Sequence, residues 1–525
     1  MENGDTQPVL RMSQIIRNVL KVAGNTFLSR ILGFVRDIVL AHLFGAGNAA
    51  DAFFVAQRIP NLFRRLFGEG AFSQAFVPIL GEYRTTKSDA DTRNFVADVA
   101  GWLALVLTGI TLLGIVGASL LVFLMAPGFA TDPAKFSLTV ELTRITFPYL
   151  FLVSLVALSG GILNTYGHFT VPAFTPVFLN LGLIAAALFW APHLAQPVIA
   201  VAWGMIFGGV AQLAFQLPAL RKVGHLHLPR LGRNDPGIAR VLKLMGPAAF
   251  GASVAQVNLF LNTVLASLVG SNVVSYLYYS DRLVEFPLGV LGVALGTVVL
   301  PALSRQAAEK SPAFPSTLDW GLRWAWLIGL PATVGLLLLG HRLLLSLFAY
   351  GAYSAADAAQ SNLSLIGYGL GILPIIAVRV LAPAFYARQD TRTPVYFGMA
   401  SMGINIIVSL VLAWPLHQLG LSLATTAGAV ANAFLLAFRL RQTGVYRPLA
   451  GWAPFLAKTT VAAAAMGFLI WHFRGKVTEW LAWTAAQRMF HVLLLVTAAA
   501  LVYFLILLAW RLQELSALRR QRPVP

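Results

Sequence analysis

Long apolar runs recur along almost the whole of this 525-residue chain, separated by short polar loops. A transmembrane α-helix needs about 20 mostly apolar residues to cross the hydrocarbon core of a bilayer, and about fourteen runs reach that length. The sequence therefore predicts an all-α polytopic membrane protein with about fourteen transmembrane helices. The expected spans are 18–44, 50–82, 94–126, 137–165, 171–191, 197–221, 239–269, 273–304, 318–348, 359–387, 394–415, 419–440, 451–472 and 487–511.

Composition agrees with a membrane protein and excludes several other classes. Charged residues make up only 11% of the chain, whereas a soluble protein carries roughly 25%. The net charge of +18 does not indicate nucleic-acid binding, because most Lys and Arg lie in short loops between the spans. The absence of Cys excludes disulfides, thiolate metal sites and thiol nucleophiles. The polar N-terminal extension lacks the features of a signal peptide, so we expect the first helix to direct insertion.

The charges of the loops predict the orientation of the chain. Basic residues gather in the loops that follow every second span and in the C-terminal tail, while the opposite loops carry only Lys135, Arg474 and Lys476. The positive-inside rule places the basic loops in the cytoplasm. Because the predicted number of spans is even, both termini are expected on that side as well.

An internal repeat predicts two lobes. The segment around Arg58 resembles the segment around Arg282, and FVPIL at Pro78 resembles VVLPAL at Pro301. A parallel repeat of six spans implies two lobes related by an axis along the membrane normal. The expected divisions are a polar cytoplasmic extension (1–17), an N-lobe with helices 1–6 (18–223), a cytoplasmic linker (224–237), a C-lobe with helices 7–12 (238–443), and helices 13 and 14 with a cytoplasmic tail (444–525).

Arginines within the first two spans predict a positively charged cavity. An arginine at mid-membrane depth costs at least ~2.5–3.5 kcal/mol, so such residues normally face a cavity or a partner. Cations outnumber acids in residues 29–83. The cations are Arg30, Arg36, Arg58, Arg64 and Arg65. The acids near them are Asp37, Asp51 and Glu69, and Glu82 follows at the end of the stretch. The positive surplus favours an anionic substrate.

Helical spacing separates the residues of the second span into two faces, since residues three, four and seven apart share a face. Gln57, Asn61 and Arg64 lie on one face, and Arg64 is the better substrate contact. The other face carries both acids and cations, which can pair as structural or gate ion pairs. These residues are Asp51, Arg58, Arg65 and Glu69.

Three further groups of charges allow more than one interpretation. Arg30 and Arg36 both reach one cavity most easily if the first helix bends near Gly33, and Asp37 is spaced to pair with Arg30. Arg282 and Glu285 are three residues apart and can neutralise each other. Arg379 is either a gate partner for an acid such as Glu69 or a side chain that snorkels to the headgroups, and snorkelling is the alternative for every one of these arginines.

The sequence contains no recognisable enzyme site. It has no Walker A loop, and its histidines are not set at metal-ligand spacing, so we expect no catalytic residues, no metal and no cofactor. Transport must then be driven by an ion gradient, the membrane potential or the substrate gradient. The sequence does not choose between Na⁺ and H⁺ as a coupling ion.

These motifs resemble the MurJ/MviN family of lipid II flippases, within the multidrug/oligosaccharidyl-lipid/polysaccharide exporter superfamily. The likeness extends over nearly the whole chain. It is carried by SRILGFVRD (29–37), ADAFFVAQRIPNLFRRLFGEGAFSQAFVPIL (50–80), YYSDRLVEFPLGVLGVALGTVVLP (278–301) and LAPAFYARQDTRTPV (381–395).

The resemblance implies a bacterial inner-membrane protein that supports peptidoglycan synthesis. Members of the family move lipid II, an undecaprenyl-pyrophosphate-linked disaccharide-pentapeptide, from the cytoplasmic to the periplasmic leaflet by alternating access. Their last two helices form an apolar groove for the polyprenyl tail. The implied partners are lipid II and membrane lipids, and contact with the cell-wall synthesis machinery stays open. The cavity arginines of the family match Arg30, Arg36, Arg64 and Arg282, and its acids match Asp51, Glu69 and Glu285.

Two alternatives remain at this point. An ion-coupled exporter of drugs or of another polyprenyl-linked oligosaccharide would share the superfamily fold, but an exporter of cationic drugs is expected to have an acidic cavity. A non-transporting scaffold for cell-wall enzymes would not need arginines within its membrane helices.

Overall fold

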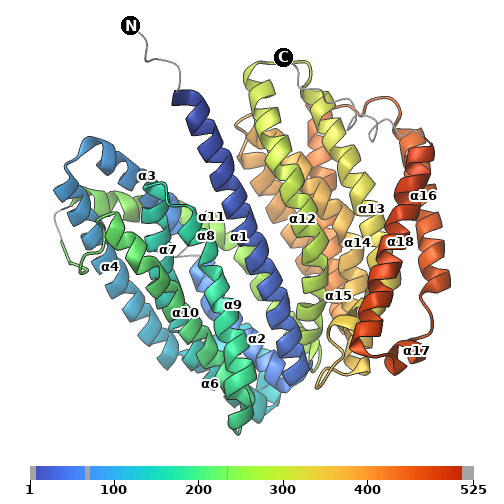
Figure 1. Cartoon of the computed structure of the whole chain (residues 1–525), viewed down its shortest axis with the longest axis horizontal. Coiled ribbons are helices and arrows are strands. Elements are labelled where there is room, and N and C mark those ends of the chain that lie inside the picture. The colour runs from blue at the N-terminus through green and yellow to red at the C-terminus, as the bar shows by residue number, and fades with distance from the viewer. Residues whose placement is uncertain (1–6, 66–70, 233–234, 511–525) are drawn as a thin grey trace. The chain divides into compact units, whose positions relative to one another are not determined.

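The computed structural model describes residues 7–65, 71–232 and 235–510, and all the regular structure in these ranges is helical (Figure 1). The first part of the chain forms α1 (Gln7–Phe44), α2 (Asn48–Phe63), α3 (Ala71–Thr86), α4 (Asp89–Val116), α5 (Ala118–Met125), α6 (Pro133–Thr146), α7 (Tyr149–Thr165), α8 (Thr170–Phe174), α9 (Pro176–Ala185), α10 (Pro197–Lys222) and α11 (Pro236–Val269). The second part forms α12 (Val273–Ala308), α13 (Phe314–Leu347), α14 (Ala355–Tyr386), α15 (Arg392–Gln442), α16 (Trp452–Phe473), α17 (Val477–Ala482) and α18 (Ala485–Ala509).

The predicted all-α membrane architecture is confirmed. Within the described ranges, nine helical stretches are long and apolar enough to cross a membrane. One of them, α15, is two helices joined at His417, whose φ of 48° and ψ of −128° are not helical. These two helices correspond to the expected spans 394–415 and 419–440. The total of fourteen spans remains a prediction.

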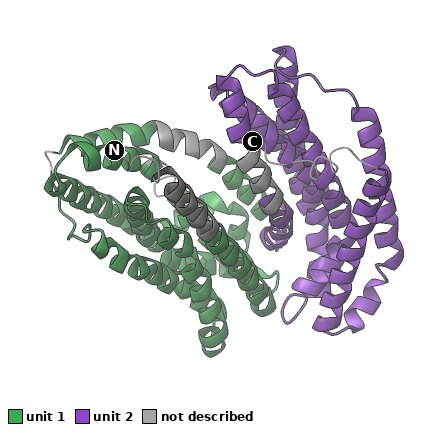
Figure 2. Cartoon of the chain, turned by 45° about the horizontal axis from the view of Figure 1, so that its top comes forward, with its two compact units in different colours: residues 1–268 green, residues 269–525 purple. Residues whose placement is uncertain are grey.

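The chain divides into two compact units, residues 1–268 and 269–525 (Figure 2). By its contacts α11 belongs to the first unit, whereas the sequence repeat groups it with the second lobe. The lobe boundaries that the repeat predicts therefore stay a prediction, and each unit is described by itself below.

In the first unit, the segment after α10 lies along α4. The backbone N–H of Arg230 donates to the carbonyl of Ala97 at 3.0 Å, and Trp102 Nε1 donates to the carbonyl of Gly232 at 2.8 Å. This close approach requires a glycine at position 101, because a Cβ there would overlap the backbone of Arg230. The cytoplasmic linker that the sequence predicts is thus fixed to the unit over residues 230–232.

The second unit fixes the corresponding segment through Asp319 on α13. Its Oδ1 accepts hydrogen bonds from Tyr446 Oη at 2.6 Å, Trp452 Nε1 at 2.7 Å and the N–H of Leu449 at 3.2 Å, while its Oδ2 pairs with Arg323. Two of these partners lie beyond residue 448. The last helices are therefore an integral part of this unit.

The two units end their long helices α10 and α15 with the same backbone motif, which supports the repeat. Gly224 and Gly444 both have positive φ, 76° and 71°, and each N–H donates to the carbonyl three residues earlier at 3.1 Å. A left-handed glycine just past a helix end is a common helix stop. The glycines are 220 positions apart (444 − 224), and Asp98 and Asp319, near the linker segments, are 221 apart (319 − 98).

Helix α1 continues through Gly33 without interruption, and no residue between 7 and 44 leaves the helical conformation. The structure therefore shows no unwinding near Gly33, and the bend expected there stays a prediction. A glycine permits a bend but does not require one.

Candidate functional site

The buried charge on α1 is an ion pair between neighbouring residues. Arg36 Nε and Nη2 both donate to Asp37 Oδ1, at 2.9 and 2.7 Å, and both residues are buried. Arg36 Nη1 donates to Asn180 Oδ1 on α9 at 3.0 Å. The spacing predicts a pair between Asp37 and Arg30. In the structure Asp37 pairs with its neighbour Arg36 instead. Arg30 itself is exposed.

The polar face predicted on α2 forms a chain of hydrogen bonds. Arg64 Nε donates to Asn61 Oδ1 at 3.2 Å, and Asn61 Nδ2 donates to the carbonyl of Gln57 at 2.9 Å. All three residues are half-buried. Because an arginine can only donate hydrogen bonds, Asn61 orients Arg64 without neutralising its charge.

Asp51 has a partner that helix spacing did not predict. Lys135 Nζ of α6 lies 2.6 Å from Asp51 Oδ2, and the two side chains are only 5% and 1% exposed. The ammonium group also lies 4.2 Å from the centroid of the Phe129 ring. The signal that could have identified this pair is the unusual position of Lys135 in a loop otherwise without cations.

The other charges predicted on the second span have different surroundings. Arg58 Nη1 donates to Thr263 Oγ1 of α11 at 3.0 Å, so it connects two helices of the first unit. Arg65 is exposed. Glu69 lies outside the described residues, and its predicted role as a gate acid stays a prediction.

In the second unit, Arg282 and Glu285 form the pair that their spacing predicts. Arg282 Nη1 lies 2.7 Å from Glu285 Oε2, and its guanidinium lies 4.9 Å from the centroid of the Tyr278 ring. Tyr278 Oη also accepts a hydrogen bond from Arg282 Nη2 at 3.2 Å. The pair is partly exposed, with 31% of the Arg282 side chain and 54% of the Glu285 side chain accessible.

Arg379 Nη1 donates to the carbonyl of Leu288 on α12 at 2.7 Å, and the side chain is exposed. This contact joins α14 to α12. It does not distinguish the gate interpretation from snorkelling, so both remain open.

The four arginines that the sequence assigns to an anionic ligand differ in their surroundings. Arg30 is exposed, Arg64 contacts the Asn61 amide, and Arg36 and Arg282 each have a carboxylate partner. Among the described residues, no cluster of three or more His, Asp and Glu side chains could hold a metal ion. Guanidinium groups suit the recognition of anions, and of phosphate oxygens in particular.

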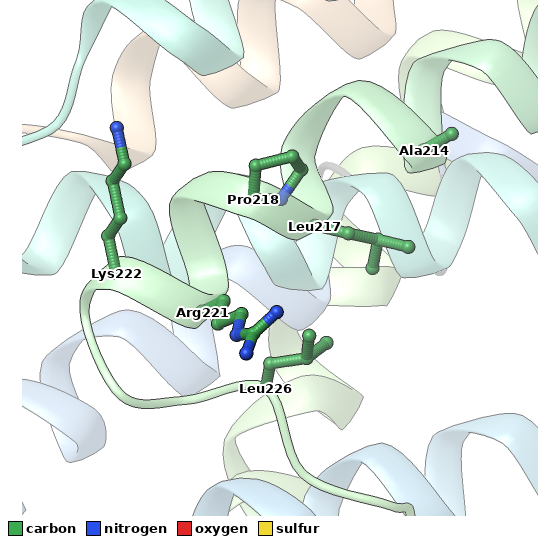
Figure 3. A pocket seen from close by; sticks show the side chains of 6 residues that line it. All are labelled: Ala214, Leu217, Pro218, Arg221, Lys222 and Leu226. Atoms are coloured by element: carbon green, nitrogen blue, oxygen red, sulfur yellow. The ribbon is translucent and has the colours of Figure 1, made fainter.

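Two pockets lie away from these arginines. One, of about 600 Å³ at the C-terminal end of α10, is lined by Ala214, Leu217, Pro218, Arg221, Lys222 and Leu226 (Figure 3). The other, of about 280 Å³, is lined almost entirely by apolar atoms of Ala457, Lys458, Val461 and Trp510, from α16 and the end of α18. This second pocket lies on the last two long helices, where the family resemblance implies an apolar groove.

Known proteins match this chain over most of its length. The family model "Lipid II flippase MurJ" matches residues 40–491. A protein of Vibrio cholerae named "Probable lipid II flippase MurJ" is 43% identical over 515 residues, covering 96% of this chain and 98% of the relative. The "Lipid II flippase MurJ" of Burkholderia cenocepacia is 43% identical over 463 residues, covering 87% of this chain and 90% of the relative.

Solved structures agree with these sequence matches. A structure described as "Lipid II flippase MurJ, inward closed conformation" has a TM-score of 0.79 and 25% identity, covering 93% of this chain and 98% of the other. An inward-facing multidrug transporter of the MATE family has a TM-score of 0.63 at 14% identity, which shows a shared fold alone. Since the family model and the close relatives extend over most of both units, this chain belongs to the lipid II flippase MurJ family.

Proposed function

We propose that this protein is a transporter that moves lipid II from the cytoplasmic to the periplasmic leaflet of the bacterial inner membrane. The observation that carries the proposal is the 43% identity to a named MurJ relative over 96% of the chain. The helical membrane fold supports it. Alternating access is part of the proposal. The solved relative is described in an inward closed conformation, which is one of the states of an alternating-access cycle.

Arg30, Arg36, Arg64 and Arg282 bind the pyrophosphate of the substrate in this proposal, with Gln57 and Asn61 beside Arg64. Pyrophosphate carries several negative oxygens, and the planar guanidinium fork can bind two of them at once. Asn61 keeps Arg64 oriented while leaving its charge uncompensated by that contact. Asp37 and Glu285 reduce the charge of their arginine partners, so the ligand has to compete with them.

The apolar pocket on α16 and α18 supports a place for the polyprenyl tail on these helices. Moving the tail from hydrocarbon into water would cost about 25 cal/mol per Å² of apolar surface. A groove on the last two helices lets the tail stay in an apolar environment while the head group crosses the membrane.

The experiment is complementation in cells depleted of their own flippase, with lipid II translocation measured in the same cells. Alanine at Arg30, Arg36, Arg64 or Arg282 should abolish growth support while the protein still reaches the membrane. Lysine should restore function only partly, because it lacks the planar fork. Arg93→Ala is the matched control, since Arg93 is an exposed residue that donates to a backbone carbonyl at the start of α4. Growth support by all four alanine variants would refute the proposed head-group site.

A further inference from the structure

Asn180 on α9 contacts α1 at two points, one on each side of Gly33. Its Oδ1 accepts the hydrogen bond from Arg36 Nη1 at 3.0 Å, and its Nδ2 donates to the carbonyl of Ser29 at 3.1 Å. The same Nδ2 lies 3.4 Å from the carbonyl of Pro176 on its own helix. Asn180 is only 6% exposed, so these contacts are made in the interior of the unit.

The orientation of this amide follows from its partners. The guanidinium of Arg36 can only donate, and the carbonyl of Ser29 can only accept, so the amide oxygen must face Arg36 and the amide nitrogen must face Ser29. A carboxylate at this position would lose the donor, and an aliphatic side chain would lose both contacts. Among the side chains of this size, asparagine supplies the acceptor and the donor on two separate atoms, as two partners on either side of the amide require.

The guanidinium of Arg36 is therefore held at two edges. Asp37 Oδ1 accepts from Nε and Nη2, and Asn180 accepts from Nη1. A free arginine side chain loses considerable rotamer entropy when it is fixed, and here that loss has already occurred before a ligand binds. The contact with Ser29 also fixes the backbone next to Arg30.

We propose that Asn180 is a positioning residue for substrate binding: it orients the Arg36 guanidinium and the backbone beside Arg30 toward the pyrophosphate. This inference rests on the proposed function, in which both arginines bind that group. Asn180 acts through the arginines and does not itself touch the substrate. A Cβ at position 33 would lie 3.8 Å from both polar atoms of the amide, an ordinary contact, so the Asn180 contacts do not require glycine there.

A purely structural bond between α9 and α1 would predict a different set of results, so the test needs a control with the same structural cost. Gln212 on α10 provides it. Its buried amide accepts from Tyr149 Oη at 3.3 Å and donates to the carbonyl of Thr175 at 3.3 Å. Gln212→Leu removes a buried amide from the same unit without touching Arg36 or α1.

The experiment measures lipid II affinity and thermal stability of the full-length protein in nanodiscs. Asn180→Leu should weaken binding by roughly tenfold or more, the range for losing a hydrogen bond to a charged group. Gln212→Leu should lower stability comparably and leave the affinity within about twofold. Combining Asn180→Leu with Arg36→Ala should weaken binding by less than the product of the two single effects, because the two changes share the Arg36 contact and only the contact beside Arg30 is lost in addition.

The outcomes separate this inference from the proposed function. If Arg36→Ala binds lipid II like the wild type, the proposed head-group site fails and the inference fails with it. If Arg36→Ala binds weakly but Asn180→Leu binds normally, Asn180 is structural only and the inference is overturned. If Asn180→Leu does not fold, Asn180→Asp replaces it in the test. This variant keeps an acceptor for Arg36 but adds a negative charge beside the guanidinium, so unchanged lipid II affinity would overturn the inference as well.

Discussion

Replacing Lys135 with methionine should destabilise the protein strongly, because it leaves the Asp51 carboxylate buried without its lysine partner. The side chains are 5% and 1% exposed, and Nζ lies 2.6 Å from Oδ2. At that distance and an effective dielectric constant of about 20, the attraction between unit charges is about 6 kcal/mol. The desolvation of both groups offsets much of this when the pair is intact. Removing one partner leaves the penalty of the other, about 3–5 kcal/mol.

The assay is thermal unfolding of purified variants in one detergent, compared by midpoint because a membrane protein of this size is not expected to unfold in two states. Lys135→Met should have the lowest midpoint of the set. Adding Asp51→Asn should recover part of the loss, since the buried carboxylate that has lost its lysine is then removed as well. Both variants keep side chains of similar size at the two positions.

Arg240→Met is the matched control. Arg240 pairs with Glu82 at 2.7 Å in the same unit, but these side chains are 50% and 47% exposed. Exposed ion pairs contribute little to stability, so this variant should melt close to the wild type. Equal midpoints for Lys135→Met and Arg240→Met would refute the reasoning from burial, and so would a double variant no more stable than Lys135→Met.

Three further predictions follow from the fold. Gly33→Ala should keep lipid II transport and melt at the same or a slightly higher temperature, because α1 is continuous at Gly33 and a Cβ has room there. Loss of transport in this variant would show that a bend at Gly33 is needed. His225, in the segment after α10, is buried with its Nε2 2.6 Å from Oη of Tyr166 at the end of α7. Burial lowers the pKa of His225 below its ordinary value of 6.5, so the unfolded segment takes up a proton first as the pH falls through about 6.5. The docking of the linker should therefore weaken on going from about pH 7.5 to about pH 5.5. Amide hydrogen exchange of residues 223–232, corrected for the intrinsic rate, should become faster at the lower pH in the wild type but not in His225→Gln. An equal pH response in both proteins would contradict the role of His225. A topology reporter inserted after Arg233 should be cytoplasmic and one near Asn48 periplasmic, and finding both on one side would contradict the orientation.

Contacts within one helix could be predicted from the sequence, because helical geometry alone determines them. The spacing of Gln57, Asn61 and Arg64 predicts one polar face, and Asn61 does contact both of the others. The Arg282–Glu285 pair follows from the same rule. The fold class was equally accessible, since span length and loop charge depend on the bilayer rather than on tertiary contacts.

Contacts between helices could not be predicted in this way. Lys135 and Asp51 are 84 residues apart, and Asn180 and Arg36 are 144 apart, so which polar side chains meet depends on packing that no local pattern encodes. Asp37 illustrates a second limit. Its neighbour Arg36 lies on a different helical face, yet the long side chain of an arginine can reach around the helix to the carboxylate.

We propose that this protein moves lipid II across the membrane through arginine contacts with the pyrophosphate of the substrate. The most direct measurement is the transfer of lipid II between leaflets of proteoliposomes that contain purified wild-type protein, Arg64→Ala or Arg93→Ala, with ion gradients imposed in turn. We expect transfer with the wild type and Arg93→Ala under at least one gradient, and loss of transfer with Arg64→Ala. Transfer by Arg64→Ala at the wild-type rate, or no transfer by the wild type under any gradient, would contradict the claim.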